Sequence, residues 1–296
     1  MKPPSPHPEA KDLAAGERPR PPGVPAERTA AAQFDFGKNW QLFSEHALTP
    51  EKVRQARRDF ARLLQGIDLK GKSFLDIGFG QGLSLLIATA MDARTVGCDI
   101  NPTCGEVLEA NKRLFFPEVA AAPVPVIIGS ILADAVLADL RRASPEGTGL
   151  YDLVHSWGVL HHTGNMELAL KNAASLVKPG GYLILALYNR HWTSPLWLGI
   201  KYLYHKSPPL LRQGMIHLFY PLIYLAKLVI TGENPRKQTR GMDFYYNVVD
   251  WVGGYPYEYA PREEIIARLQ PLGLEIQRFI PAQVPTGCNE FIFRKD

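Results

Sequence analysis

The residues best suited to ligand chemistry are the glycines at positions 78, 80 and 82 and an acid, Asp76, just before them. Glycines at every second position permit a tight turn and let a ligand approach the backbone closely. A dinucleotide-binding loop would read G-x-G-x-x-G, but the residue three places after Gly80 is Leu83. The Asp76 carboxylate would also repel a pyrophosphate, so the loop suits a cationic ligand that carries an amino group.

The motif Asp76-x-Gly78-x-Gly80-x-Gly82 resembles motif I of the class I methyltransferases that depend on S-adenosylmethionine (SAM). In that family the glycine loop lies under the methionine part of SAM, and the acid of the motif helps to hold it. Asp99 stands where the family's second acid hydrogen-bonds both ribose hydroxyls, and a carboxylate offers two strong acceptors to such a diol. The resemblance therefore implies SAM as the cofactor and S-adenosylhomocysteine (SAH) as the product.

Further segments extend the resemblance over roughly residues 67–190 and 260–296. Ser130 stands where many relatives place an Asp that accepts from the adenine amino group, so this contact is open between its hydroxyl and the backbone. The segment 151–163 resembles the family's D-x-V … V-L-H-H element, and the Lys-Pro-Gly-Gly turn at 178–181 is interpreted as turn geometry only. The predicted cofactor contacts are Asp76, Gly78, Phe79, Gly80, Gly82, Asp99, Ile100, Ser130, Ile131 and Trp157.

Two adjacent histidines, His161 and His162, are the candidates for a general base. They follow the fourth predicted strand, at the edge where open α/β sheets bind ligands. The sulfonium of SAM is already activated, so the enzyme has to align an acceptor, exclude water and remove a proton if the acceptor carries one. The sequence does not choose between the two histidines, and both could instead only hydrogen-bond the loop.

Short apolar segments that alternate with helical stretches must position these residues. Ser73–Ile77 and Tyr182–Tyr188 are typical of the strands, and the fully apolar run at 183–187 indicates a sheet covered on both faces. This alternation predicts a Rossmann-like, doubly wound α/β fold with a seven-stranded, mostly parallel sheet. The last two strands are expected at Leu274–Phe279 and Glu290–Arg294.

The chain divides into five predicted parts. Residues 1–33 are rich in Pro and Ala without periodicity and are expected to be disordered, and residues 34–66 form a helical cap in which Thr49-Pro50-Glu51 begins a helix. Residues 67–189 form the SAM-binding core, 190–258 an insertion after the fifth strand, and 259–296 a helix and strand pair that complete the core.

The second half of the insertion is the predicted acceptor pocket. Residues 240–258 interleave aromatic side chains with acids and an arginine, as small-molecule pockets do, although a loop that merely packs on the domain would look similar. The turn before the last strand could close this pocket. The predicted substrate contacts are Arg240, Asp243, Tyr246, Trp251, Tyr255, Tyr257 and Asn289.

Basic and apolar residues concentrate in the first half of the insertion. Between His191 and Arg240 the only acid is Glu233, whereas the formal charge of the whole chain is +4. Residues 215–230 are apolar nearly all round, so the segment 192–230 suits either peripheral contact with a membrane or a buried helical lid. The three scattered cysteines suggest a reducing cytoplasm, and no metal site is expected.

The function that these features predict is methyl transfer from SAM to a small-molecule acceptor, with a resemblance to the quinone- and sugar-modifying branch of the family. Oxygen, nitrogen and carbon all remain open as the methylated atom. One alternative is a nucleic-acid methyltransferase, but the segment after strand four reads His155-Ser156-Trp157-Gly158, without the Asn/Asp-Pro-Pro motif of enzymes that act on base amines. Another is a SAM-binding regulatory module without methyl transfer.

Overall fold

The computed structural model describes residues 34–236 and 240–296, so the tail predicted to be disordered, 1–33, lies outside the described residues. Seven strands form one sheet in the order β3-β2-β1-β4-β5-β7-β6, with β7 antiparallel to both of its neighbours and the other pairs parallel. This arrangement confirms the predicted fold class. The strands are β1 (Ser73–Ile77), β2 (Arg94–Asp99), β3 (Val126–Ile128), β4 (Tyr151–Trp157), β5 (Val177–Tyr188), β6 (Leu274–Ile280) and β7 (Cys288–Lys295).

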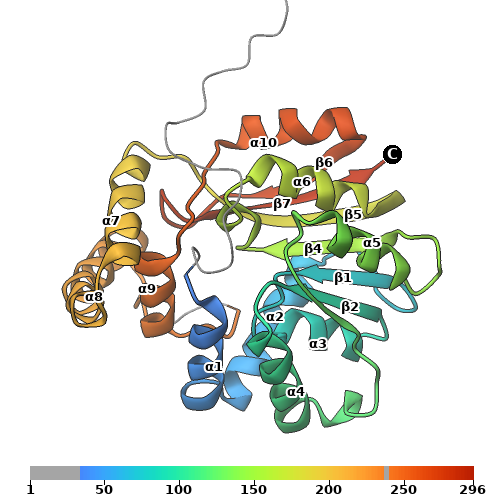
Figure 1. Cartoon of the computed structure of the whole chain (residues 1–296), viewed down its shortest axis with the longest axis horizontal. Coiled ribbons are helices and arrows are strands. Elements are labelled where there is room, and N and C mark those ends of the chain that lie inside the picture. Colours follow the sequence, from blue (N-terminus) through green and yellow to red (C-terminus); the bar gives the residue numbers. More distant parts are fainter. Residues whose placement is uncertain (1–33, 237–239) are drawn as a thin grey trace, which may run out of the picture.

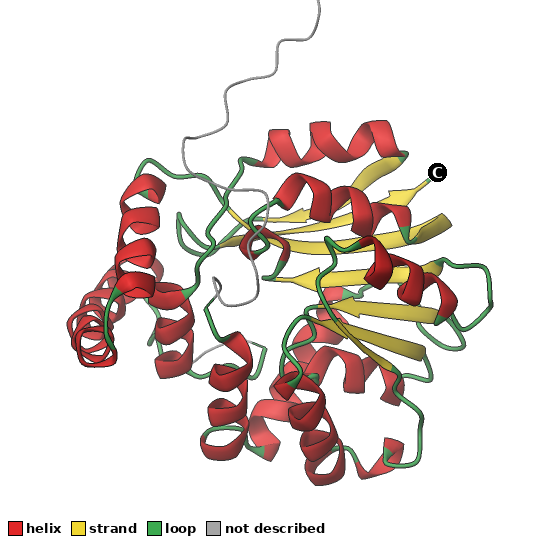
Figure 2. Cartoon of the chain, in the orientation of Figure 1, coloured by secondary structure: helices red, strands yellow, loops and turns green. Residues whose placement is uncertain are grey.

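Helices cover both faces of the sheet and enclose two apolar cores (Figures 1 and 2). Leu140, Leu170 and Ile265 belong to the core on one face, while Phe60 and Leu108 belong to the core on the other. This two-sided burial explains why the central strands are continuously apolar. The helices of the core are α3 (Leu83–Ala90), α4 (Thr103–Phe115), α5 (Asp134–Arg142), α6 (Met166–Ser175) and α10 (Arg262–Leu269).

The fifth strand begins earlier than predicted, at Val177 instead of Tyr182. Val177 pairs with Tyr151 on β4, and the register then shifts before Tyr182 pairs with Leu153. The Pro-Gly-Gly turn thus lies inside an irregular strand, because a bulge absorbs the extra residues. The prediction of this boundary was wrong for that reason.

Helices from two distant parts of the chain meet at the carboxyl edge of the sheet. The N-terminal pair is α1 (Phe36–His46) and α2 (Pro50–Leu63), and the Thr49 hydroxyl caps α2 by accepting from Lys52 N at 3.3 Å. The insertion forms α7 (Ser194–Lys206), α8 (Pro209–Thr231) and α9 (Phe244–Gly253). Figure 1 shows α9 between α1 and the α7–α8 pair, so the two segments together wall off the carboxyl ends of the strands.

Candidate functional site

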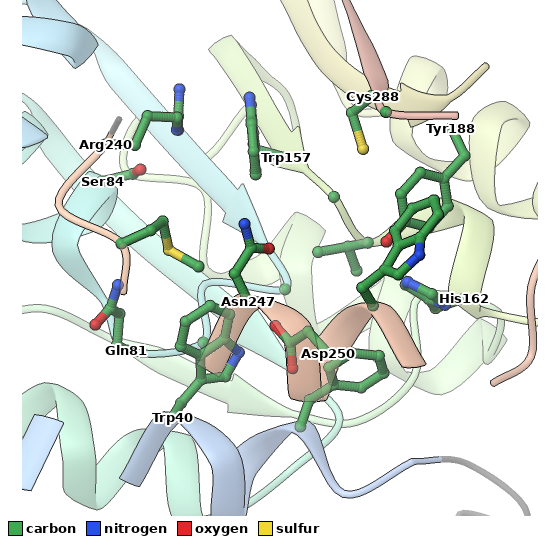
Figure 3. Close-up of a pocket in the computed structure, with 18 of the residues that line it drawn as sticks. Trp40, Gln81, Ser84, Trp157, His162, Tyr188, Arg240, Asn247, Asp250 and Cys288 are labelled. Atoms are coloured by element: carbon green, nitrogen blue, oxygen red, sulfur yellow. The ribbon is translucent and has the colours of Figure 1, made fainter. Parts of the chain in front are cut away.

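A cavity of about 870 Å³ lies at the carboxyl edge of the sheet. Its lining combines the glycine loop after β1 with Asp99 at the end of β2, and with residues of α8 and α9 from the insertion (Figure 3). This volume lies toward the upper end of the range for ligand pockets. A cofactor and a small acceptor can therefore share this one space.

The glycine loop has the conformation that its sequence predicts. Gly78 and Gly80 have φ angles of +74° and +55°, a region that side chains with a Cβ rarely adopt. A Cβ on Gly78 would lie 2.4 Å from the Val159 side chain, and one on Gly80 would lie 2.9 Å from Trp40 Nε1. Only glycine therefore fits at these two positions, and both line the cavity, which suits close approach of a ligand to the backbone.

Asp99 lies at the centre of the cofactor half of the cavity. Its Oδ2 accepts from Gly80 N at 3.0 Å and its Oδ1 accepts from Asn101 N at 2.9 Å, so the carboxylate ties the loop to β2. Burial raises the pKa of Asp99, although these two backbone donors and the Cys104 thiol oppose the shift. Each carboxylate oxygen has a second lone pair. Asp99 can thus hold the loop and still accept from the two hydroxyls of a ribose.

The Asp99→Ala variant is expected to bind SAM at least about tenfold more weakly, since a buried diol would lose its charged acceptor. Calorimetry with SAH measures this loss. Asp99→Asn is the matched control, because it keeps an oxygen for the backbone donors and should lose less affinity than the alanine variant. Unchanged affinity in Asp99→Ala would show that Asp99 has no part in cofactor binding.

The residues predicted to contact adenine lie after β2 and β3. Ile100 remains 39% exposed although it is aliphatic, and Gly129, Ser130 and Ile131 line the cavity with it. The Ser130 hydroxyl oxygen accepts from Leu132 N at 3.2 Å. Its proton is still available to a ligand, so Ser130 can act as a donor where many relatives have an acceptor.

The acid of the glycine motif has a histidine partner. His155 Nδ1 lies 2.7 Å from Asp76 Oδ1, and both side chains are at most 3% exposed. Strand register explains the pair, because Asp76 on β1 lies directly beside His155 on β4. His155 Nε2 is buried with no hydrogen-bond partner among the described residues. His155 therefore orients the Asp76 carboxylate, which lines the cavity beside the loop.

The two predicted base candidates are buried, and their positions differ. His162 lines the cavity and contacts Pro256 O through Nδ1 at 2.5 Å, whereas His161 lies behind it and accepts from Tyr188 N at 3.3 Å. Burial lowers the pKa of His162 to about 3, and that of His161 is also lowered well below its ordinary value. At neutral pH both imidazoles are neutral and weakly basic.

The predicted substrate contacts separate into two groups. Arg240 and Trp251 line the cavity, and the Arg240 guanidinium lies 4.3 Å from the centre of the Trp157 ring. Asp243 instead caps α9 and pairs with Lys52 at 3.0 Å. The other predicted contacts that lie outside the cavity lining are Tyr246, Tyr255, Tyr257 and Asn289.

Several lining residues were not predicted from the sequence. Asn247 and Asp250 of α9 point into the cavity in Figure 3, and Trp40 comes from α1. Trp197 of α7 and Glu290 of β7 complete this side, with Glu290 Oε1 accepting from Trp157 Nε1 at 3.1 Å. The signal for the α9 residues was their helical spacing, which brings positions 247, 250 and 251 onto one face.

The fold and the cavity together define a Rossmann-like enzyme whose site suits an adenosyl cofactor with a cationic amino-acid end. The Gly78–Gly80 backbone, Asp76 and Asp99 fit the three polar parts of SAM.

A family model described as a methyltransferase domain matches residues 46–231, which is more than half of the chain. The chain therefore belongs to the methyltransferase-domain family, as a class I SAM-dependent methyltransferase with SAM as its cofactor. The recognition made from the glycine and Asp99 motifs is thus confirmed.

Curated relatives and solved structures agree with this family. The ubiquinone biosynthesis O-methyltransferase of Rhodopseudomonas palustris (strain BisB18) is 27% identical over 170 residues, which cover 56% of this chain and 61% of the relative. Its counterpart in Bradyrhizobium sp. (strain ORS 278) is 26% identical over 184 residues, covering 58% and 66%. The chain thus spans less than two thirds of the length of these relatives.

Among solved structures, an O-methyltransferase family protein from Burkholderia thailandensis superposes with a TM-score of 0.50 at 16% identity. The match covers 87% of this chain and 59% of that one. At this level of identity the likeness supports the fold.

Proposed function

We propose that the protein transfers a methyl group from SAM to a small, largely apolar acceptor that enters from a membrane surface. The observation that carries the proposal is the continuity of one cavity between the glycine loop and the insertion. Phe244, Val248 and Trp251 of α9 and Ile223 of α8 give its acceptor half an aromatic and aliphatic wall. The similarity to ubiquinone O-methyltransferases supports an acceptor of the quinol type.

Each part of the cavity has a separate role in this proposal. The backbone of the Gly78–Gly80 loop and the Asp76 carboxylate would hold the methionine end of SAM, and Asp99 would hold its ribose. When bound, SAM supplies an electrophilic methyl group on a sulfonium. The walls of the insertion exclude water and orient the acceptor. Turnover of SAM to SAH with a panel of quinols, phenols, amines and thiols tests this function.

The surface of the insertion supports a peripheral membrane location. Helix α8 is 23 residues long and apolar enough to cross a membrane by length and composition, yet only 11% of its most apolar window is buried. Met215 and Ile216 are the buried residues of this helix, which favours a surface helix over a buried lid. The exposed aliphatic residues of α8 are Leu210, Leu211, Leu218, Leu222, Leu225, Leu228, Val229 and Ile230.

The geometry of α8 favours a helix that lies on a bilayer over one that spans it. One face packs on α9 through Ile216 and Tyr220, and Ile223, Ala226 and Ile230 line the cavity. The exposed face would then insert its leucines at the level of the lipid headgroups. Exposed Lys206 and the scarcity of acids suit anionic lipids. An apolar acceptor would pass from the bilayer to the cavity along α8. The free cysteines suggest that the protein lies on the cytoplasmic side of this membrane.

The described basic residues of the insertion give little support to a nucleic-acid acceptor. Lys201 is completely buried and Arg240 lines the cavity against Trp157, so two of the basic residues of the insertion face inward. The exposed side chains of α8, which lies between them, are mainly aliphatic. This distribution favours a lipid surface over a phosphate backbone.

Leu222→Glu combined with Leu225→Glu is expected to weaken binding to vesicles of phosphatidylglycerol and phosphatidylcholine at least about tenfold. Each exposed leucine would contribute on the order of 1.5 kcal/mol or more on insertion, and a carboxylate opposes both the apolar phase and the lipid charge. Vesicle co-sedimentation measures the change. Leu114→Glu is the control, since Leu114 is 71% exposed on α4, outside the insertion. Equal binding of all variants, or a dimer that buries α8, would exclude the membrane as the occupant.

A further inference from the structure

We propose that Asp250 is the general base of the reaction and that the acceptor therefore carries a weakly acidic hydroxyl, such as a phenol. The inference rests on the proposed function and deepens it, because it selects oxygen as the methylated atom. The supporting observation is the position of the Asp250 carboxylate. One of its oxygens is held by a hydrogen bond, and the other faces the acceptor half of the cavity.

Asn39 of α1 holds the Asp250 side chain. Asn39 Nδ2 donates to Asp250 Oδ1 at 2.7 Å and to the Tyr246 carbonyl at 3.3 Å, so a residue from outside the insertion fixes this carboxylate. Asp250 Oδ2 makes no hydrogen bond with any residue in the described part of the chain. The side chain lines the cavity, and Figure 3 shows it between Trp40 and His162. One oxygen is thus anchored and the other faces the space that an acceptor would fill.

The electrostatic surroundings suit a base that works near neutral pH. Burial raises the pKa of Asp250 to about 7, although Asn39 and the buried amine of Lys201 lower it. The other titratable groups that interact with Asp250 are Tyr188 of β5 and Tyr204 of α7, and burial raises the pKa of both phenols, which stay neutral. A general base is most effective when its pKa lies near the operating pH.

The histidines are less suited to this task. His162 lines the same cavity, but its pKa of about 3 makes it a much weaker base at neutral pH. His161 lies behind it and does not line the cavity. Glu290 also lines the cavity, but it lies on β7 beside Trp157 and interacts with the charged Arg240 guanidinium. Asp250 is therefore the carboxylate with both access and basicity.

The step balances without any further reactant. The acceptor oxygen forms a new bond to the methyl carbon, the carbon–sulfur bond breaks with its electron pair left on sulfur, and the hydroxyl proton moves to Asp250 Oδ2. The products are a methyl ether, SAH and a protonated carboxyl that releases its proton to solvent as the products leave. An acceptor that is already ionised would not need the base.

The test compares catechol with 4-nitrocatechol as acceptors, because the nitro compound ionises at a much lower pH. In Asp250→Asn, SAH formation with catechol should fall at least about a hundredfold, the contribution typical of general-base catalysis. With 4-nitrocatechol at pH 8 the same variant should lose less than about fivefold. The catechol rate of the wild-type protein should rise with pH to a plateau with a midpoint near 7, and the variant should lack this midpoint. An equal loss with both acceptors would overturn the proposal.

A second measurement does not depend on turnover. Because the pKa of Asp250 is raised in the folded protein, wild-type stability should fall relative to Asp250→Asn as the pH rises from 4 to 7. A pH-independent difference in unfolding free energy would overturn the proposal even if Asp250→Asn were inactive. Asn39→Ala keeps the carboxylate but removes its donor, so its catechol midpoint should move to higher pH.

Asp243→Asn is the matched control, since asparagine caps a helix as well as aspartate does and residue 243 lies outside the cavity lining. Its ratio of catechol to 4-nitrocatechol turnover should equal that of the wild-type protein. SAH formation with amines or thiols but with no phenol would overturn this inference and leave methyl transfer standing. Failure to bind SAH would instead overturn the proposed function.

Discussion

Gly78→Ala is expected to lower the affinity for SAM at least about a hundredfold. The φ angle of +74° costs an alanine roughly 1–2 kcal/mol, and its Cβ would lie 2.4 Å from both γ-carbons of Val159. Since no Cβ is found at such a distance, the loop or the segment after β4 must move. Both line the cofactor half of the cavity, so the movement falls on the surface that SAM contacts.

Gly180→Ala is the matched control for this loop. Gly180 has the same φ of +74°, but a Cβ there would meet nothing within 4 Å. This variant should lose about 1 kcal/mol of stability from backbone strain and keep its affinity for SAH. Calorimetry with SAH and thermal unfolding of both variants separate the two effects. If both variants bound SAH normally, the glycine loop would not be the cofactor site.

Lys201→Met is expected to change the pH dependence of stability by several kcal/mol. Lys201 is completely buried, donates to the Trp251 carbonyl in the last turn of α9, and lies 4.7–5.6 Å from the ring centres of Trp251, Tyr257 and Tyr188. Burial lowers its pKa from 10.5 to about 7. The unfolded chain therefore binds a proton between pH 7 and 10 that the folded protein does not.

The direction in which stability changes with pH follows from this difference in proton binding. Wild-type stability should rise relative to Lys201→Met as the pH increases from 7 to 10, because the unfolded state holds more protons in this window. Each pH unit in which only the unfolded state holds the proton adds about 1.4 kcal/mol to the stability of the wild-type protein relative to the variant. The rise in stability from pH 7 to 10 is therefore at most about 4 kcal/mol. Urea unfolding at several pH values measures it, with the exposed Lys206→Met of the same helix as the control. Parallel pH curves for Lys201→Met and the wild-type protein would contradict the burial of this amine.

The cofactor half of the site was predictable because each of its parts is local. A strand, a glycine loop and a helix follow one another in the chain, so Asp76 and Gly78–Gly82 occupy adjacent positions in sequence and in space. Asp99 follows the same rule on the next strand. The spacing of a few neighbouring residues determines both the fold and the chemistry there.

The acceptor half depends on contacts that no local pattern contains. Asp243 was predicted from the sequence as a substrate contact and Asp250 was not, but residue 243 caps α9 and residue 250 faces the cavity from the last turns of that helix. The anchor of Asp250 comes from Asn39, over two hundred residues earlier. Lys201 is one of the basic residues of the insertion, and nothing in its local sequence indicates the three aromatic rings that surround its amine. Tertiary packing decided each of these positions.

The distribution of the tryptophans gives the protein two separate optical reporters. Of its five tryptophans, Trp40, Trp157, Trp197 and Trp251 line the cavity, whereas Trp192 is 83% exposed just before α7. Entry of a cofactor or an acceptor should alter the emission of the four inner indoles, and lipid should shift that of Trp192 to shorter wavelengths. The emission of a Trp192→Phe variant reports ligand binding alone. Subtracting it from the wild-type emission leaves the signal of Trp192, which reports vesicle binding, and neither measurement needs an attached dye.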